Sequence, residues 1–554
     1  MLKRNPPIRS IREMMQLAVA DHPEKIAYQF KKEETLVSVT VRAFYESLEA
    51  LGAALTALGF GKSHVACVGE NSYPWIQTFV TVLMSAGVFV PLDKELPADQ
   101  MLFLLRESDS EVVFCSEKYE SLFAERRAEI PNVKKFVCFE RAADEGDFLS
   151  FEGLIARGAA LDKTAYDSLH SDENELKYLV YTSGTTGVAK GVMLSEHNIV
   201  SGIHYGLKVS HIYERGLAVL PFNHTYEAVC ELLVSIQAGA TVCINDSLRH
   251  VLKNIQFYQP SHIYLVPAFS DLFYDKIHAS IRKQGKEKKF RFAVRLSNFL
   301  RKFGIDLRRK LFKEIHAQFG GNLRRIVCGG APIRPEVGRF FDDIGIALTG
   351  GYGITECSPL VSVNDDDSTN NFSSAGHRLA CLEWRIDNPS PEGVGEICVR
   401  GDVVMLGYYK RPDLTAEAIR NGWFYTGDYG RLTEKDEIVI TGRKKNIILM
   451  SNGKNIYPEE LELKISELPY VTEVVVSGIK NEFGEDTGLA AELYLSDETI
   501  PHEDIPGDIN RALSDLPLYK RISKIICRKE PFPKTTTNKI KRGQAVPAVP
   551  GADS

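Results

Sequence analysis

The sequence has little of what marks an exported or disulfide-stabilised protein. Its ten cysteines are scattered from Cys67 to Cys527 and include no C-x-x-C pair, a distribution that favours reduced thiols over a disulfide framework or a zinc site. The N-terminus carries basic residues but lacks the uninterrupted apolar run of a secretory signal. We therefore expect a cytoplasmic protein.

A strong net charge and a long apolar run are also missing. The formal net charge of −6 over 554 residues is weak and implies no overall attraction to nucleic acid, so no nucleic-acid partner is expected. The most apolar stretch, Trp75 to Leu92, is slightly short for a membrane span and is interrupted by four polar residues. It predicts a buried helix followed by a strand.

The chain does contain a long alternation of apolar strands and helical patterns. Its 554 residues exceed a single core and suggest two to four structural units at about 150 residues each. Runs such as "SHVACVGEN" and "SEVVFCSE" alternate with helical stretches such as "LPADQMLFLLRES", which predicts an α/β fold. From about Gly395, strand and hairpin patterns precede a helix and another strand, which indicates a compact α+β unit.

One short stretch, "YTSGTTGVAKG" at 181–191, has the composition of a phosphate-binding loop. It follows an apolar strand and combines four hydroxyl side chains, glycines and Lys190, so hydroxyls, backbone amides and one cation can all face an anion. Because Lys190 precedes a glycine, the spacing differs from the Walker pattern. With Ser195 as the cap of a following helix, the stretch predicts a strand, loop and helix suited to phosphate.

Four later motifs accompany this loop in a fixed order. They are "GGYGITE" (350–356), "YTGDYG" (425–430), "GRKKNIILMSNGKNIYPEELE" (442–462) and "PKTTTNKIKR" (533–542). Together they resemble the adenylate-forming superfamily of acyl-CoA synthetases, adenylation domains and firefly-type luciferases, over almost the whole chain. The chain most resembles a bacterial long-chain fatty acid–CoA ligase.

The resemblance implies a specific division of the chain. An N-terminal AMP-binding domain of α/β subdomains, including a β-rich subdomain, is expected over 1–441. A hinge at 442–445, with Lys445 as the hinge residue, leads to a small mobile α+β lid domain at 446–542. Residues 543–554 are expected to be a disordered tail.

The implied reaction activates a carboxylic acid, most simply a medium- or long-chain fatty acid. ATP and Mg²⁺ convert the acid to an acyl-AMP with release of pyrophosphate, and the thiol of coenzyme A then displaces AMP. An acyl carrier protein is an alternative acceptor, since it presents the same thiol. An alternative hypothesis is a sensor that binds an acyl group or a nucleotide with little or no catalysis. Its only support among the motifs is Asn538, which occupies a position where the family usually has glycine.

The resemblance also implies the site residues. Lys539 matches the catalytic lysine, Glu356 the magnesium ligand and Thr355 a phosphate-contacting threonine. The other residues expected to contact the nucleotide are Thr182, Ser183, Gly184, Thr185, Thr186, Gly187, Lys190, Gly330, Ala331, Pro332, Gly351, Tyr352, Gly353, Asp428 and Arg443.

Three further positions are expected to contact the acid or the thiol. His224 matches a histidine near the acyl pocket, although a core histidine bonded to backbone is an equal alternative. Gly376 permits close approach beside the carboxylate, and Gly453 borders the thiol tunnel.

A long segment from Phe269 to Gly320 predicts a helical insertion, which resembles long-chain enzymes. Between Arg282 and Lys313 it holds thirteen basic residues and two acidic ones, interleaved with Phe, Leu and Val. Peripheral contact of 282–313 with an anionic membrane, at its inner face, is one interpretation. A solvated helical face is the other.

Overall fold

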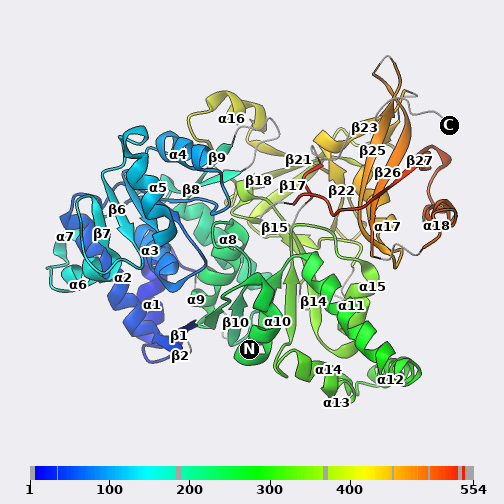
Figure 1. The fold of residues 1–554 in the computed structure, drawn as a ribbon, viewed down its shortest axis with the longest axis horizontal. Helices are drawn as coiled ribbons and strands as arrows, with labels where there is room; N and C mark the ends of the chain where they lie inside the picture. The colour runs from blue at the N-terminus through cyan, green and yellow to red at the C-terminus, as the bar shows by residue number, and fades with distance from the viewer. Residues whose placement is uncertain are drawn as a thin grey trace. The chain divides into compact units, whose positions relative to one another are not determined.

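The computed structural model describes residues 7–33, 35–182, 189–365, 372–451, 454–482, 484–496, 500–534 and 540–542. The chain forms two compact units. The larger comprises Met1–Glu383 with Val399–Phe424, and the smaller comprises Trp384–Cys398 with Tyr425–Ser554. Figure 1 labels their helices and strands.

The larger unit contains an eight-stranded sheet. Its strands, in spatial order, are β19 (Gly407–Tyr408), β9 (Lys190–Ser195), β8 (Leu176–Thr182), β4 (Val88–Pro91), β3 (His64–Val68), β5 (Val112–Cys115), β6 (Lys135–Cys138) and β7 (Phe148–Ser150). The strands from β8 to β7 pair in parallel, whereas β9 is antiparallel to both of its neighbours. Every residue of β4 and β5 is buried, as expected where helices cover both faces of a parallel sheet.

Helices accompany this sheet in the predicted alternation. They are α1 (Ile11–Asp21), α2 (Val41–Ala57), α3 (Tyr73–Met84), α4 (Ala98–Glu107), α5 (Glu120–Glu125), α6 (Phe151–Ala159) and α7 (Thr164–Asp167). Figure 1 shows α6 and α7 beside α2. The apolar stretch at 75–92 forms α3 and β4, both buried, which confirms the predicted helix and strand.

A second, nine-stranded sheet occupies the rest of the larger unit. Its order is β16 (His377–Arg378), β15 (Leu360–Val363), β14 (Ala347–Gly353), β13 (Arg325–Cys328), β12 (His262–Leu265), β10 (Arg215–Ala218), β11 (Thr241–Ile244), β1 (Ile26–Lys32) and β2 (Thr35–Thr40). The strands from β14 to β1 pair in parallel, whereas β15, β16 and β2 are antiparallel.

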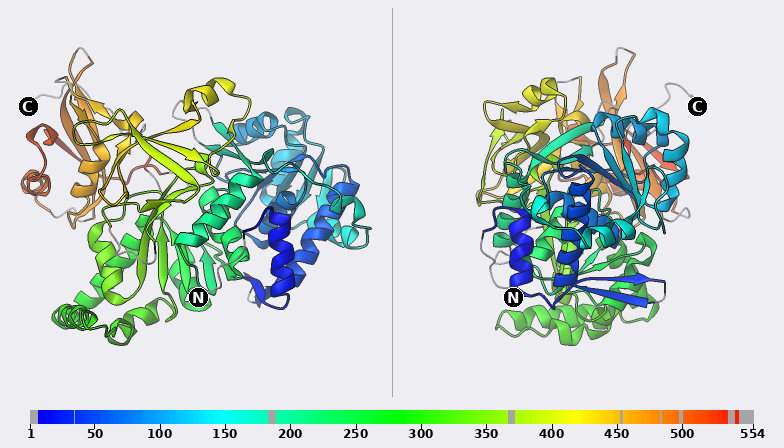
Figure 2. Two further views of the ribbon diagram at one scale, coloured as in Figure 1. Left: turned by 180° about the vertical axis from the view of Figure 1, so that it is seen from behind. Right: turned by 90° about the vertical axis from the view of Figure 1, so that its left-hand side faces the viewer.

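The predicted insertion is helical. It contains α11 (Pro267–Lys283), α12 (Glu287–Arg301), α13 (Arg308–Leu311) and α14 (Lys313–Gln318), and α15 (Pro335–Ile344) follows β13. Phe273 of α11, Ile315 of α14 and Phe312, between α13 and α14, join one buried cluster with β13 and α15. Both views in Figure 2 show the green insertion helices at the rim of the larger unit.

The smaller unit is α+β, as the change of pattern after Gly395 predicts. It includes most of β17 (Leu382–Asp387), β18 (Gly395–Gly401) and β21 (Trp423–Leu432), and all of β22 (Ile438–Arg443). A three-stranded sheet of β25 (Val471–Lys480), β26 (Asp486–Leu495) and β27 (Lys524–Arg528) shares a core with α17 (Pro458–Ile465) and α18 (Ile505–Ala512).

The structure bears on the predicted fold class but does not test the predicted domain boundaries and hinge. The α/β region followed by a smaller β-rich one is confirmed. The boundaries at 441 and 446 and the hinge at Lys445 stay predictions, because compact packing does not report motion. Among the described residues, no helix is long and apolar enough to cross a membrane.

Candidate active site

The carboxyl ends of neighbouring parallel strands bring several predicted residues to one edge of the nine-stranded sheet. β10, β12, β13 and β14 are parallel neighbours. The chain leaving β10 carries His224, the chain leaving β13 carries residues 330–332, and β14 ends in Gly351, Tyr352 and Gly353. In open α/β sheets this edge is where ligands bind.

The loop after β13 has the properties of a wall against which a flat base could lie. Gly330 has a φ of +86°, which favours glycine, and Ala331 and Pro332 are exposed. Tyr226 supports the loop, since its hydroxyl donates to the Val327 carbonyl at 3.0 Å. Its ring would lie 3.1 Å from a Cβ at Gly329, so a side chain there would disturb the packing.

Glu356 is held by a tyrosine from a distant part of the larger unit. The Tyr408 hydroxyl donates to Glu356 Oε1 at 2.9 Å, and Lys190 Nζ lies 5.1 Å from the centroid of the Tyr408 ring. Burial, and then the nearby Glu356 charge, raises the pKa of Tyr408 far above its ordinary value, so this hydroxyl stays protonated and donates. Tyr408 thus has a carboxylate at its hydroxyl and an ammonium over its ring.

Backbone hydrogen bonds and strand pairing also hold Glu356 and Tyr408 in place. Thr355 and Glu356 lie in a single helical turn, Thr355–Cys357, and the Met405 amide donates to the Glu356 carbonyl at 2.9 Å. Tyr408 lies on β19, which pairs with β9 so that Tyr408 is opposite Val192. The position of Glu356 therefore depends on long-range strand pairing.

The predicted phosphate loop is flanked by two paired strands. Thr182 ends β8 and Lys190 begins β9, and these two residues are directly opposite each other. Ser183, Gly184, Thr185, Thr186 and Gly187 lie outside the described residues. The flanks alone bring a hydroxyl and an ammonium to the two ends of the loop.

The prediction that the loop leads directly into a helix is wrong. Strand β9 intervenes, and α8 (Glu196–Val209) begins only after Ser195. Ser195 is the predicted cap: its side chain accepts from the Asn198 amide and Asn198 bonds back to the Ser195 amide. The Asn198 side-chain amide also donates to the carbonyls of Asp402 and Val404, which ties α8 to the segment before Met405.

Glu356 is a chemically suitable ligand for Mg²⁺. In the described part of the chain, no group of three or more His, Cys, Asp or Glu side chains is placed to hold a metal. Mg²⁺ is commonly bound by one or two carboxylates together with phosphate oxygens and water. One oxygen of Glu356 accepts from the Tyr408 hydroxyl, and a carboxylate in this position fits the ion.

Gly376 and His224 lie at the margins of the same sheet. Gly376 has a φ of +82°, and a Cβ there would lie 2.2 Å from the Val363 carbonyl carbon, so only glycine fits. The chain therefore approaches its own strand β15 closely at this point. The carbonyl of His224 accepts from the Ala228 amide at 3.0 Å, at the entry to a π-helical turn, Tyr226–Leu233.

In the smaller unit, Asp428 on β21 and Arg443 on β22 are register partners. Arg443 Nε lies 3.2 Å from Asp428 Oδ1, and Asp428 is buried. Lys445 lies in the following turn, where burial and then the Arg443 charge lower its pKa. Gly453 and Lys539 lie outside the described residues.

Sequence reasoning missed Tyr408 and Tyr226. Tyr408 lies on a strand of two residues, too short to produce a periodic pattern, and its importance comes from a partner 52 residues away. Tyr226 follows the expected His224, so the segment was identifiable but the contact with Val327 was not.

An α/β fold with a carboxylate, a lysine and the two flanks of a glycine-rich segment at the ends of its strands is the arrangement expected of a nucleotide-binding enzyme. A family model described as "AMP-binding enzyme" matches residues 15–409. The chain belongs to this family.

Curated relatives agree with that assignment, and a solved structure has the same fold. The chain is 27% identical over 491 residues to a long-chain-fatty-acid–CoA ligase, FadD15, of Mycobacterium bovis, covering 84% of this chain and 79% of the relative. It is 26% identical over 504 residues to the ligase ACSBG1 of Rattus norvegicus, covering 86% and 70%. The anthranilate CoA ligase AuaEII, solved with anthranoyl-AMP, has the same fold, with a TM-score of 0.78 at 19% identity and 97% coverage of both chains.

Proposed function

We propose that the protein joins a medium- or long-chain fatty acid to coenzyme A at the expense of ATP. A carboxylate oxygen of the acid attacks the α-phosphorus of ATP, the bond to pyrophosphate breaks, and an acyl-AMP forms. The coenzyme A thiol then attacks the acyl carbon, loses its proton and displaces AMP. The observation that carries the proposal is the Glu356–Tyr408–Lys190 cluster in a chain whose named relatives are long-chain fatty acid–CoA ligases.

The roles proposed for individual side chains follow from their charge and position. Lys190 and Thr182, at the two ends of the loop, would neutralise and hydrogen-bond phosphate oxygens. Tyr408 would position Glu356 through its hydrogen bond. Bound at Glu356, Mg²⁺ would supply positive charge to the phosphate oxygens. Asp428 would accept hydrogen bonds from ribose hydroxyls, and Arg443 would orient it.

The proposal is tested by product analysis across a panel of acids from acetate to oleate. Pyrophosphate release is measured with ATP and Mg²⁺, with and without coenzyme A, and acyl-AMP and acyl-CoA are followed by mass spectrometry. Turnover that peaks at longer chains and yields acyl-CoA is expected. If acyl-AMP accumulates in the presence of coenzyme A, the acceptor would be an acyl carrier protein. If no acid gives an adenylate, the result would favour a sensor.

We expect Lys539→Ala to separate the two half-reactions. The resemblance gives this lysine contacts with the carboxylate and α-phosphate, so its loss removes charge stabilisation from the first step only. Adenylation should fall by about 100-fold or more, while thioester formation from supplied acyl-AMP stays within about threefold of the wild type. Equal losses in both half-reactions would contradict this division of labour.

The proposed substrate also bears on where the enzyme acts. Long acyl chains partition into bilayers, so an enzyme that uses them gains from contact with a membrane surface. We propose such peripheral contact through residues 282–313.

A further inference from the structure

Helix α12 has two distinct apolar faces. At about 100° per residue, Phe290, Ala293, Val294 and Ser297 fall on one side of the helix. The three apolar residues pack against the core cluster of the larger unit, and Ser297 is fully buried. This inner face accounts for the attachment of α12 to the fold.

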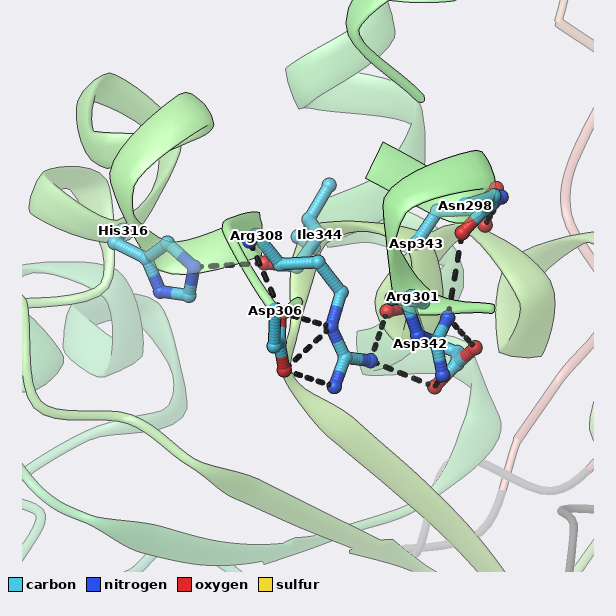
Figure 3. Close-up of polar contacts among 8 residues, drawn as sticks. All are labelled: Asn298, Arg301, Asp306, Arg308, His316, Asp342, Asp343 and Ile344. Carbon is cyan, nitrogen blue, oxygen red and sulfur yellow. Dashed lines mark hydrogen bonds and ion pairs between the residues drawn. The ribbon is translucent and has the colours of Figure 1, made fainter. Parts of the chain in front are cut away.

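Polar contacts fix that attachment at the end of α15, as Figure 3 shows. Arg301 Nη1 lies 2.9 Å from Asp342 Oδ2, and Asn298 Nδ2 donates to Asp343 Oδ1 at 2.7 Å. Arg308 of α13 donates to the Asp342 carbonyl at 2.8 Å. These contacts hold helix α12 in one orientation. The side of the helix that faces away from the core is therefore exposed to solvent.

The outer face of α12 consists of bulky apolar side chains. Phe292, Leu296 and Phe299 lie opposite the inner face, and Phe303 follows at the same spacing. The three phenylalanines are 68%, 57% and 66% exposed, and the Phe299 and Phe303 rings contact edge to face at 5.2 Å between centroids. A continuous exposed apolar patch usually marks an interaction surface.

Basic residues flank this outer face on both sides. Helical geometry places Lys289 on one flank. The other flank holds four basic residues: Lys288, Arg291, Arg295 and Lys302. All five are exposed, and within the described part of the chain none forms an ion pair, unlike Arg301 and Arg308 on the inner side. The flanking positive charge is therefore free to attract an anionic partner.

We propose that this outer face docks on an anionic lipid bilayer, with the phenylalanines inserted and the basic side chains against the headgroups. An apolar face bordered by lysine and arginine is the pattern of an interfacial helix. A nucleic acid would use the charges but leave the phenylalanines in water. This proposal rests on the proposed function, because an enzyme that uses long-chain fatty acids gains access to its substrate at a lipid surface.

Vesicle flotation of the full-length protein tests the surface directly. Neutral vesicles of phosphatidylcholine are compared with vesicles containing about one third phosphatidylglycerol. The wild type should float with the anionic vesicles only. Each basic residue contributes about fivefold to partitioning, so K288Q/R291Q/R295Q should lower it about 100-fold, and F292S/F299S/F303S should lower it at least about tenfold.

Matched variants separate this surface from general effects. L518S replaces a 78% exposed residue of the smaller unit, and K62Q/K253Q removes exposed charge elsewhere; both should float like the wild type. All variants should convert soluble octanoate as the wild type does, whereas the α12 variants should lose turnover of oleate delivered in anionic vesicles. If no acid is converted, the proposed function fails while flotation still decides the surface.

Four results would overturn the proposal. The first three are equal flotation with neutral and anionic vesicles, unchanged flotation of the α12 variants, and a dimer in sedimentation that F292S/F299S/F303S converts to monomer. The third would assign the face to a second copy of the chain. Retention of an oligonucleotide that K288Q/R291Q/R295Q abolishes, without flotation, would assign it to nucleic acid.

Discussion

The two units position their candidate nucleotide residues in different ways. In the larger unit, Glu356 is held by Tyr408, 52 residues later, on a strand that pairs with β9. In the smaller unit, Asp428 and Arg443 face each other across two successive paired strands. The first arrangement depends on long-range packing and the second on local register, so the two should respond differently to substitution.

The largest expected effect is at Glu356. Glu356→Gln keeps an oxygen that can accept from Tyr408 but removes the negative charge that suits Mg²⁺. Pyrophosphate release should fall about 100-fold or more, because the charge on the phosphates is then less well neutralised. Steady-state kinetics at varied Mg²⁺ concentration measures the loss.

Tyr408→Phe is the companion variant, since it removes only the hydrogen bond to Glu356. A loss of about tenfold is expected, the cost of one hydrogen bond to a charged group. A loss as large as that of Glu356→Gln would mean that the long-range contact, and not the carboxylate charge, limits the reaction.

A smaller effect is expected at Arg443. Arg443→Lys keeps the charge but loses the planar fork beside Asp428, so the KM for ATP should rise about fivefold with little change in kcat. Lys464→Ala, which breaks a surface ion pair with Asp515 in the same unit, is the control and should leave the KM unchanged. A change in kcat alone would argue against a role in binding the nucleotide.

The smallest effect concerns stability and tests how firmly β8 is anchored. Lys177 on β8 is almost fully buried, and its ammonium donates to the Ser85 carbonyl and to Ser171 Oγ. Burial lowers the pKa of Lys177 from 10.5 to about 8. Between these values the unfolded chain binds the proton and the folded chain does not, so this group makes stability rise with pH.

From pH 7 to pH 9 the contribution is about 1 kcal/mol. Chemical denaturation at both pH values, in the wild type and in Lys177→Met, measures it. The difference in unfolding free energy between the two proteins should change by this amount. A pH-independent difference would show that Lys177 titrates normally in the folded protein.

The same contrast explains what the sequence could predict. The strands around 395–401 and 471–480, the buried segment at 75–92 and the cap at Ser195 follow from local pattern, and the structure has them. The contact of Tyr408 with Glu356 was not predictable, because it depends on pairing of β19 with β9. Strand β9 was not predicted, because the glycine-rich loop was expected to be followed by a helix and not by a second strand.

Helix α15 connects the wall of the candidate nucleotide site to the insertion helices. Arg334, just before its first turn, pairs with Asp271 of α11 at 3.3 Å, and Asp342, near its last turn, pairs with Arg301 and Arg308. Ten residues of α-helix span about 15 Å. Its two ends are thus held by ion pairs to α11, α12 and α13, so a substitution that displaces α12 is expected to shift α15 and, with it, the loop at 330–332.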